Sequence, residues 1–124
     1  MTPLGRKLRE MRAERGVTMQ RMASELGVSA AYLSALEHGK RGAPSWQLLQ
    51  RIIRYFNVIW DEAEELERLA FLSNPRIVVD TAGLTPEATE LANRLAERIK
   101  TLEAEELRAL IAILSATAPA RRRG

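Results

Sequence analysis

Side chains that form hydrogen bonds gather in one short stretch of this chain, next to two positive charges. Tyr32, Ser34 and His38 carry hydroxyl or imidazole groups, and Lys40 and Arg41 follow closely. Hydroxyl and imidazole groups can both donate and accept hydrogen bonds, whereas Lys and Arg offer donors and charge only. The combination suits recognition of a polar, negatively charged partner, such as the base edges and phosphates of a nucleic acid.

The chain offers little for bond-making or metal chemistry. It has no cysteine and a single histidine, His38, so disulfides, thiolate metal sites, His-rich metal sites and His-based triads are excluded. It has no Gly-rich phosphate loop, and its carboxylates are spaced for ion pairs with neighbouring Arg on solvated helix faces. We therefore expect no enzyme activity, no cofactor and no metal site.

The polar stretch falls on the second of two short helices that the sequence predicts between residues 17 and 39. Thr18 and Ser29 are good N-caps, because their hydroxyls can accept from free N–H groups of a first helical turn. Gly27 stands where the chain must reverse with a positive φ, and Gly39 ends the second helix. The positions expected to face inward are Met22, Ala23, Leu26, Val28, Leu33 and Leu36. This pattern predicts a helix-turn-helix, which fits its second helix into the major groove of DNA, although a purely structural hairpin shares many of the features.

With these positions, residues 4–58 resemble the Cro/C1-type helix-turn-helix family, also called XRE-like, of bacterial and phage repressors. The resemblance covers nearly half of the chain and rests on Leu8, Arg9, Arg12, Gly16, Thr18, Ala23, Leu26, Gly27, Val28, Ser29, Leu33, Ser34, Leu36, Glu37, Gly39, Pro44, Leu48 and Ile52. It implies an all-α fold, with a five-helix lambda-repressor-like domain that binds operator DNA as a dimer. The implied motif runs from Met19 to His38.

The resemblance also bears on individual residues. It implies that Glu37 is structural, because the matching position usually ties the helix to a loop by hydrogen bonds. The chain departs from the family at Met19, where a Gln usually supports a phosphate contact. The neighbouring Gln20 is the candidate to replace that contact.

A helix over residues 29–38 that lies in the major groove would present its outward side chains to the bases. The predicted base-reading residues are Ser29, Ala30, Ala31, Tyr32, Ser34 and His38. The predicted phosphate contacts are Gln20, Arg21, Lys40 and Arg41. The helix carries no Arg or Gln, so the bidentate contact with guanine is not available from it. We expect readout by methyl contacts with thymine, by water and by DNA shape.

The charge of the chain divides along its length. Residues 1–58 contain ten basic and four acidic side chains, a net charge of +6, whereas residues 59–118 contain six basic and twelve acidic ones, a net charge of −6. The three arginines at 121–123 restore the total of +3. Because the basic half is the half with the motif, the division favours phosphate contacts in that half over a chance distribution of solvated charges.

The sequence also predicts helices in other N-terminal segments. Residues 2–15 are expected to form the first, with Pro3 in its first turn. Ser45 caps a later helix that ends at Asn57. Its apolar stripe consists of Leu48, Leu49, Ile52, Ile53 and Phe56.

A fifth helix is expected over roughly residues 62–73, capped by Asp61. Acidic residues crowd its first turns, where the helix dipole favours negative charge. Trp46 and Trp60 are the largest apolar side chains of the chain, and we expect both to be packing groups and not parts of a ligand site.

These segments suggest a domain organisation. We expect a DNA-binding domain over 1–74, an extended linker over 75–85, a helical dimerisation segment over 86–118 and a basic flexible tail over 119–124. Within the linker, Arg76-Ile77-Val78-Val79-Asp80 could be an edge strand that pairs across a dimer, but a linker is the favoured interpretation. The tail either follows DNA phosphates or acts only as a solubilising segment.

The helical segment begins with a clear start signal at Thr85, Pro86 and Glu87. The residues expected to form a dimer interface are Leu91, Leu95, Ile99, Leu102, Leu107, Leu110, Ile111 and Leu114. Burial of a Leu-sized side chain contributes roughly 1.5–3 kcal/mol, so several per chain would favour association. Docking of the segment on its own N-terminal domain is the alternative. Thr101 is the candidate cap of a second helix, and the sequence leaves open whether the segment is one helix or a hairpin.

The sequence therefore predicts a DNA-binding transcriptional regulator, in particular a homodimeric repressor of a near-palindromic operator. The alternative is an antitoxin-like regulator whose acidic C-terminal helices bind a partner protein, and a purely structural bundle is a third possibility. The chain lacks a membrane-spanning stretch and an apolar leader, so we expect a cytoplasmic protein of the bacterial cytosol or nucleoid. No small-molecule ligand is expected, because about 40 residues beyond the first domain are too few to enclose a pocket of the usual size.

Overall fold

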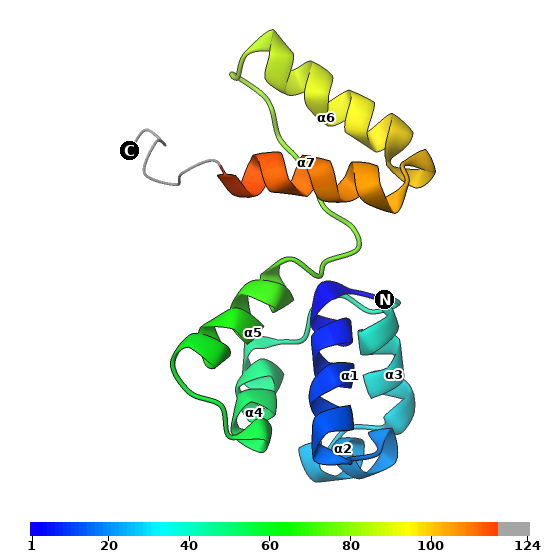
Figure 1. Ribbon diagram of the computed structural model, residues 1–124, viewed down its shortest axis with the longest axis vertical. Helices are drawn as coiled ribbons and strands as arrows, with labels where there is room; N and C mark the ends of the chain where they lie inside the picture. Colours follow the sequence, from blue (N-terminus) through cyan, green and yellow to red (C-terminus); the bar gives the residue numbers. More distant parts are fainter. Residues whose placement is uncertain (117–124) are drawn as a thin grey trace. The chain divides into compact units, whose positions relative to one another are not determined.

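The computed structural model describes residues 1–116, and this part of the chain is all-α, as the sequence predicts (Figure 1). Its elements are α1 (Pro3–Arg15), α2 (Met19–Leu26), α3 (Ala30–His38), α4 (Trp46–Phe56), α5 (Asp61–Phe71), α6 (Pro86–Arg98), the 3-10 turn η1 (Ile99–Thr101) and α7 (Ala104–Ala116). The chain divides into two compact units, of which the first is Met1–Ile77 and the second begins at Val78. The predicted tail over 119–124, with its three arginines, lies outside the described residues.

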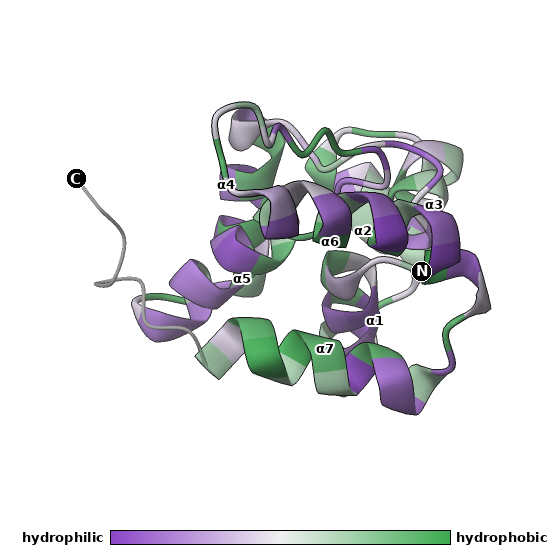
Figure 2. Ribbon diagram, turned by 90° about the horizontal axis from the view of Figure 1, so that it is seen from above, coloured by the Kyte–Doolittle hydropathy of each residue, from purple (hydrophilic) through white to green (hydrophobic). Residues whose placement is uncertain are grey.

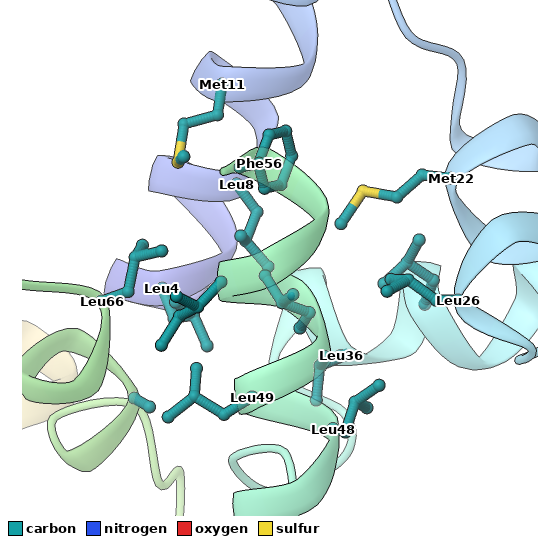
Figure 3. Close-up of a cluster of buried hydrophobic side chains, with 14 of the residues drawn as sticks. Leu4, Leu8, Met11, Met22, Leu26, Leu36, Leu48, Leu49, Phe56 and Leu66 are labelled. Carbon is teal, nitrogen blue, oxygen red and sulfur yellow. The ribbon is translucent and has the colours of Figure 1, made fainter. Parts of the chain in front are cut away.

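The first unit encloses its core between α1, α3, α4 and α5, with α2 closing one end against α3 and α4 (Figure 3). Leu8, Ile52 and Phe56 are fully buried at its centre. The other buried apolar side chains are Leu4, Met11, Met22, Ala23, Leu26, Leu33, Leu36, Leu48, Leu49, Ile53, Val58, Leu66 and Ala70. The predicted apolar stripe of α4 and the buried face of α1 therefore supply half of these side chains.

The predicted starts of α2, α3, α4 and α6 and the predicted ends of α1 to α4 are confirmed. The hydroxyl oxygens of Thr18, Ser29, Ser45 and Thr85 each accept from the backbone N–H three residues on, at the starts of α2, α3, α4 and α6. Residues in the left-handed conformation terminate the first four helices, namely Gly16, Gly27, Gly39 and Asn57. Local chemistry thus decides where each of these helices begins and ends.

The expectations for the start of α5 and for the tryptophans are wrong. Asp61 lies inside α5, and the position before it is Trp60, which has a φ of +54° and forms no side-chain cap. Trp46 and Trp60 are 62% and 80% exposed, so neither packs into the core. Trp46 is the first residue of α4, and Trp60 directly precedes α5. Their size alone was not sufficient evidence of burial.

Between Val78 and residue 116, the second unit forms the two helices α6 and α7 and not one continuous helix. The chain leaves α6 through η1, passes Leu102 in an extended conformation and reverses direction into α7 (Figure 1). Thr101 does not cap α7, because its hydroxyl donates to the Arg98 carbonyl at 2.9 Å. At the start of α7, the Glu106 carboxylate instead accepts from the backbone N–H of Glu103 at 2.8 Å, which is one of the two contacts of a capping box.

Residues 77–80, which precede the second unit's helices, contain no helix or strand. Within residues 1–116, no helix is both long and apolar enough to cross a membrane. The same residues contain no group of His, Asp and Glu side chains placed to hold a metal ion.

Candidate nucleic-acid interface

Helix α3 is fixed at both ends and along its inner face. Ser29 Oγ accepts from the Tyr32 N–H at 3.0 Å, and Gly39 ends the helix with a φ of +81°. Leu33 and Leu36 anchor the inner face in the core. Because α2 is capped and ended in the same way, the two helices form the predicted helix-turn-helix around the turn at Gly27.

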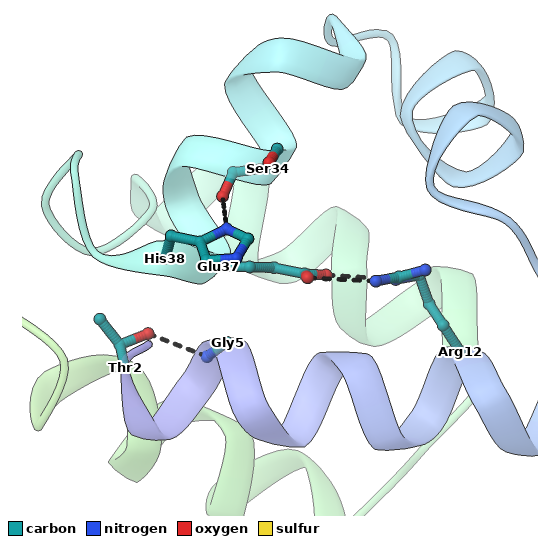
Figure 4. A network of polar contacts seen from close by, with 6 residues as sticks. All are labelled: Thr2, Gly5, Arg12, Ser34, Glu37 and His38. Atoms are coloured by element: carbon teal, nitrogen blue, oxygen red, sulfur yellow. Dashed lines mark hydrogen bonds and ion pairs between the residues drawn. The ribbon is translucent and has the colours of Figure 1, made fainter.

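A buried ion pair ties α3 to α1 (Figure 4). Arg12 Nε and Nη2 donate to Glu37 Oε2 and Oε1, both at 3.1 Å, and Glu37 is only 1% exposed. The two parallel contacts form the bidentate geometry that orients both groups. Glu37 is therefore structural, as expected, but its partner lies on α1 and not in a loop.

Gly5 allows α1 and α3 to approach closely near the same place. A Cβ atom at Gly5 would lie 2.1 Å from the Glu37 carbonyl oxygen, a distance that no side chain can occupy. The Thr2 N–H donates to the same carbonyl at 3.2 Å. Sequence reasoning missed Gly5, and its only signal was a Gly within a helical pattern, which can mark close backbone packing.

The predicted base-reading residues fall into two groups. Ser29, Ala31 and His38 are exposed, and Ser34 is half-buried. Ala30 and Tyr32 are half-buried because they pack partly against the core, so they are less displayed than the sequence predicts. The pattern did not reveal this, because both residues fall between the inner and outer faces of a short helix.

The outward face of α3 is slightly hollowed. The hollow is lined by Ala31, Ser34, Ala35, His38 and Lys40. His38 Nδ1 is 2.9 Å from the Ser34 carbonyl oxygen. Since a carbonyl only accepts, Nδ1 is the donor, and a neutral ring then leaves Nε2 as an acceptor toward a ligand. The only carboxylate on α3 is that of Glu37, which is buried, so the hollow presents polar and methyl groups beside a positive charge.

The side chains predicted to contact phosphate differ in the contacts that they already form within the protein. Gln20 and Lys40 are exposed. The Arg41 guanidinium lies over the Tyr32 ring, 5.5 Å from its centroid. Arg21 is exposed but lies 3.6 Å from Glu25, so its charge is partly balanced within α2. Lys40 and Arg41 are therefore the cations best placed beside α3.

Glu25 has a second neighbour on α4. Burial raises the pKa of Tyr55, and hydrogen bonding to Glu25 and the nearby negative charge of that carboxylate raise it further. Glu25 thus links Arg21 on α2 to Tyr55 on α4.

Other arginines of the basic half are part of the scaffold. Arg51 Nη1 donates to the Leu26 carbonyl at 2.7 Å and so satisfies the end of α2. Arg15 donates to the Phe56 carbonyl at the end of α4 and lies over the Phe56 ring. Arg12, Arg15 and Arg51 thus already form contacts within the fold. The positive charge that remains available to a ligand is therefore smaller than the net charge of residues 1–58.

Met19, where the chain departs from the family, packs partly against the core. A thioether in that environment cannot support a phosphate contact. Gln20 is exposed beside it and keeps the role of candidate substitute.

The predicted dimer-interface residues lie on the second unit. None of the residues of α6 and α7 is buried. Leu95, Leu102 and Leu107 are half-buried, and the rest are exposed, namely Leu91, Ile99, Leu110, Ile111 and Leu114. Figure 2 shows the C-terminal half of α7 as a continuous apolar stretch. The second unit therefore has apolar surface that the described chain leaves exposed.

Comparisons with known proteins agree with this architecture. A family model described as a helix-turn-helix domain matches residues 3–69. The HTH-type transcriptional repressor RghR of Bacillus subtilis is 34% identical over 61 residues, which are 49% of this chain and 45% of that protein. The uncharacterized HTH-type transcriptional regulator RghRB of the same organism is 34% identical over 61 residues, 49% of this chain and 44% of that protein.

A third relative is the HTH-type transcriptional regulator SinR of Bacillus subtilis, 29% identical over 68 residues, which are 52% of this chain and 61% of that protein. The match spans less than half the length of RghR and RghRB. No solved structure matches the chain. The family model covers more than half of the chain, over the residues that fold into α1–α5, and the chain therefore belongs to the XRE-like helix-turn-helix family.

Proposed function

We propose that this protein is a DNA-binding transcriptional regulator that inserts α3 into the major groove. The observation that carries the proposal is the outward face of α3, which is open, free of exposed carboxylate and flanked by Lys40 and Arg41. The caps of α3 and its ion pair with α1 hold this face rigid. A rigid helix of this kind loses little conformational freedom when it binds the groove.

Base recognition on this proposal depends on small and polar groups. The Ala31 methyl group fits against a thymine methyl group, and His38 Nε2 and the Ser34 hydroxyl can hydrogen-bond to base edges directly or through water. Ser29, Ala30 and Tyr32 lie nearer the start of the helix and complete the reading surface. Without Arg or Gln on the helix, DNA shape contributes a large part of the specificity.

Phosphate contacts fix the helix in register. Lys40 and Arg41 follow α3, and Gln20 and Arg21 lie in the first turn of α2. The two pairs therefore border the motif and can reach the backbone on either side of the groove. Arg41 stacks on Tyr32, so this phosphate contact also positions a base-reading ring.

We further propose that the regulator is a homodimer that represses transcription from a near-palindromic operator. The apolar residues of α6 and α7 would be buried against those of a second copy, at roughly 1.5–3 kcal/mol for each Leu-sized side chain. A two-fold dimer places two copies of α3 about 34 Å apart, one turn of the duplex. The name of one relative, a transcriptional repressor, favours repression.

A second candidate is an antitoxin-like regulator in which α6 and α7 bind a different protein. The acidic character of residues 59–118 favours a basic partner for that surface. This candidate keeps the DNA-binding role of α3 and changes only what covers the second unit.

Selection of bound sequences from random duplex DNA tests the proposal. The full chain should enrich two related half-sites in inverted orientation, with centres about 10 base pairs apart. A selection at low salt that enriches no sequence would contradict the proposal. Enrichment of isolated half-sites would support the role of α3 and contradict the dimer, and a distinct small protein that co-purifies stoichiometrically would favour the antitoxin-like candidate.

A further inference from the structure

The segment between α5 and α6 carries apolar side chains that nothing in the described chain covers. Ile77, Val78 and Val79 are 70%, 94% and 61% exposed. Residues 77–80 contain no helix or strand and form an open stretch of chain between α5 and α6 (Figure 1). In residues 1–116, the backbone groups of 76–80 form no hydrogen bond with other backbone groups. The segment therefore has β-branched side chains and free backbone donors and acceptors, the requirements for strand pairing.

The order of residues in this segment makes it complementary to itself. Arg76 precedes the aliphatic residues and Asp80 follows them, with Val78 at the centre. If two copies run antiparallel with Val78 opposite Val78, Arg76 of each copy lies opposite Asp80 of the other. Ile77 then lies opposite Val79. A parallel arrangement would instead place like charges side by side, which is unfavourable.

We propose that residues 76–80 pair with the same residues of a second copy as a two-stranded antiparallel ribbon centred on Val78. One face of the ribbon carries the aliphatic side chains of Ile77 and Val79 from both copies. The other carries Val78 between two Arg76–Asp80 pairs. A shift of register by one residue separates the charges and moves the aliphatic set to the other face, so the pattern specifies one register.

The ribbon depends on other contacts between the copies. A two-stranded ribbon alone is marginally stable in water, so it forms together with the dimer proposed above and rests on that proposal. Asp80 Oδ1 already accepts from the Ala82 N–H at 2.9 Å, which leaves Oδ2 for Arg76 of the second copy. The self-complementary order of charges is the reason to assign a second copy, and not an unrelated partner, to this segment.

Single cysteines test the ribbon, because the natural chain has none. Residues directly opposite in an antiparallel pair have Cα atoms about 4.5–5.5 Å apart, within the range that a disulfide spans. We expect Val78→Cys to form a disulfide-linked dimer rapidly under mild oxidation. Ala82→Cys, which is also exposed but lies outside the ribbon, is the matched control and should cross-link slowly.

Two further variants test the register. In this register, two copies of Ile77, or two copies of Val79, lie on a diagonal of the antiparallel pair. Diagonal neighbours are about 7–8 Å apart, which is too far for a disulfide. Ile77→Cys alone and Val79→Cys alone should therefore cross-link poorly, whereas an equal mixture of the two, one of them tagged, should give the mixed dimer. Equal cross-linking of all single variants would overturn the register.

Charge reversal provides an independent test in the Val78→Cys background. Arg76→Asp should lower the cross-linking rate about fivefold, because it places two acids opposite each other at both ends of the ribbon. The exchange Arg76→Asp with Asp80→Arg should restore it.

Sedimentation of the natural chain measures its oligomeric state, and it therefore distinguishes a failure of the proposed ribbon from a failure of the proposed dimer. A dimer in which Val78→Cys cross-links no faster than Ala82→Cys overturns the ribbon and leaves the proposed dimer intact. A chain that stays monomeric at all concentrations overturns both, while the DNA selection with half-sites still tests α3 by itself.

Discussion

At the scale of single residues, the same side-chain type serves two purposes in this domain. Arg12 is held in a bidentate pair with the buried Glu37, whereas Arg41 lies over the Tyr32 ring at the edge of the candidate interface. The first contact fixes α3 to α1, and the second leaves an exposed cation beside α3. A count of basic residues cannot distinguish these roles, because it ignores which guanidinium groups the fold already uses.

The Glu37 carboxylate should be a major contributor to stability. Glu37→Gln keeps the volume but leaves the Arg12 guanidinium without its charged partner, which costs about 3 kcal/mol for a buried pair. Glu65→Gln is the matched control, because Glu65 forms a more exposed and longer pair with Lys7 at 3.7 Å, worth about 1 kcal/mol or less. Urea unfolding of both variants measures the difference. Equal losses would show that the buried pair does not hold α3 in place.

The Tyr32 hydroxyl should contribute to sequence preference. Truncation of this side chain to Ala would also remove its packing on the core and its contact with Arg41. Tyr32→Phe removes the hydroxyl only, so a changed preference can be assigned to a lost hydrogen bond, worth about 1–3 kcal/mol at one base pair. Tyr55→Phe, which alters a half-buried tyrosine on α4, is the control. If a binding-site selection gives the same consensus for Tyr32→Phe and the natural chain, the Tyr32 hydroxyl does not contribute to base recognition.

At the scale of elements, the packing of α1 on α3 depends on a residue with no side chain. Gly5→Ala would place a Cβ 2.1 Å from the Glu37 carbonyl oxygen, so the helices must separate, at a cost of about 2 kcal/mol or more. In an open helix the same change stabilises by about 1 kcal/mol, because Ala is the better helix former. Gly16→Ala is the control, since a Cβ there meets no atom within 4 Å and only the positive φ opposes it. A melting temperature that rises for Gly5→Ala would contradict this packing.

The sequence allowed the helices to be predicted but not all of their contacts. Thr18, Ser29 and Gly27 act within one turn of their own positions, so their types were enough to place α2 and α3. Gly5 was missed because its constraint comes from Glu37, more than thirty residues away. The exposure of Trp60 was also missed, because it depends on how the chain enters α5.

At the scale of the whole molecule, the second unit is the part whose role depends most on another chain. Helices α6 and α7 bury none of their residues within the described chain. The sequence identified these apolar stripes, but no stripe specifies whether a second copy or a different protein covers it. That choice depends on the surface of the partner, which the stripe itself does not reveal.

Leu114 should be important for the proposed dimer. Leu114→Glu places a charge where the dimer buries an apolar side chain that is 65% exposed in the single chain. Two such changes per dimer should raise the dissociation constant about 100-fold or more. Ala112→Glu adds the same charge to another face of α7 and should leave the dimer intact. Sedimentation equilibrium of both variants distinguishes the outcomes, and equal effects would contradict an interface on the Leu114 face.

The central claim is that the outward face of α3 meets base edges, and a designed change of specificity tests it most directly. Ala31 is exposed in the hollow of α3, so Ala31→Arg adds the side chain that pairs bidentately with guanine. Ala13→Arg adds the same charge on the exposed side of α1 and is the control. Binding-site selection with Ala31→Arg should give a new preference for guanine at one position of each half-site, while Ala13→Arg should keep the natural consensus. An unchanged consensus for Ala31→Arg, with only a general gain in affinity, would contradict the placement of α3 in the major groove.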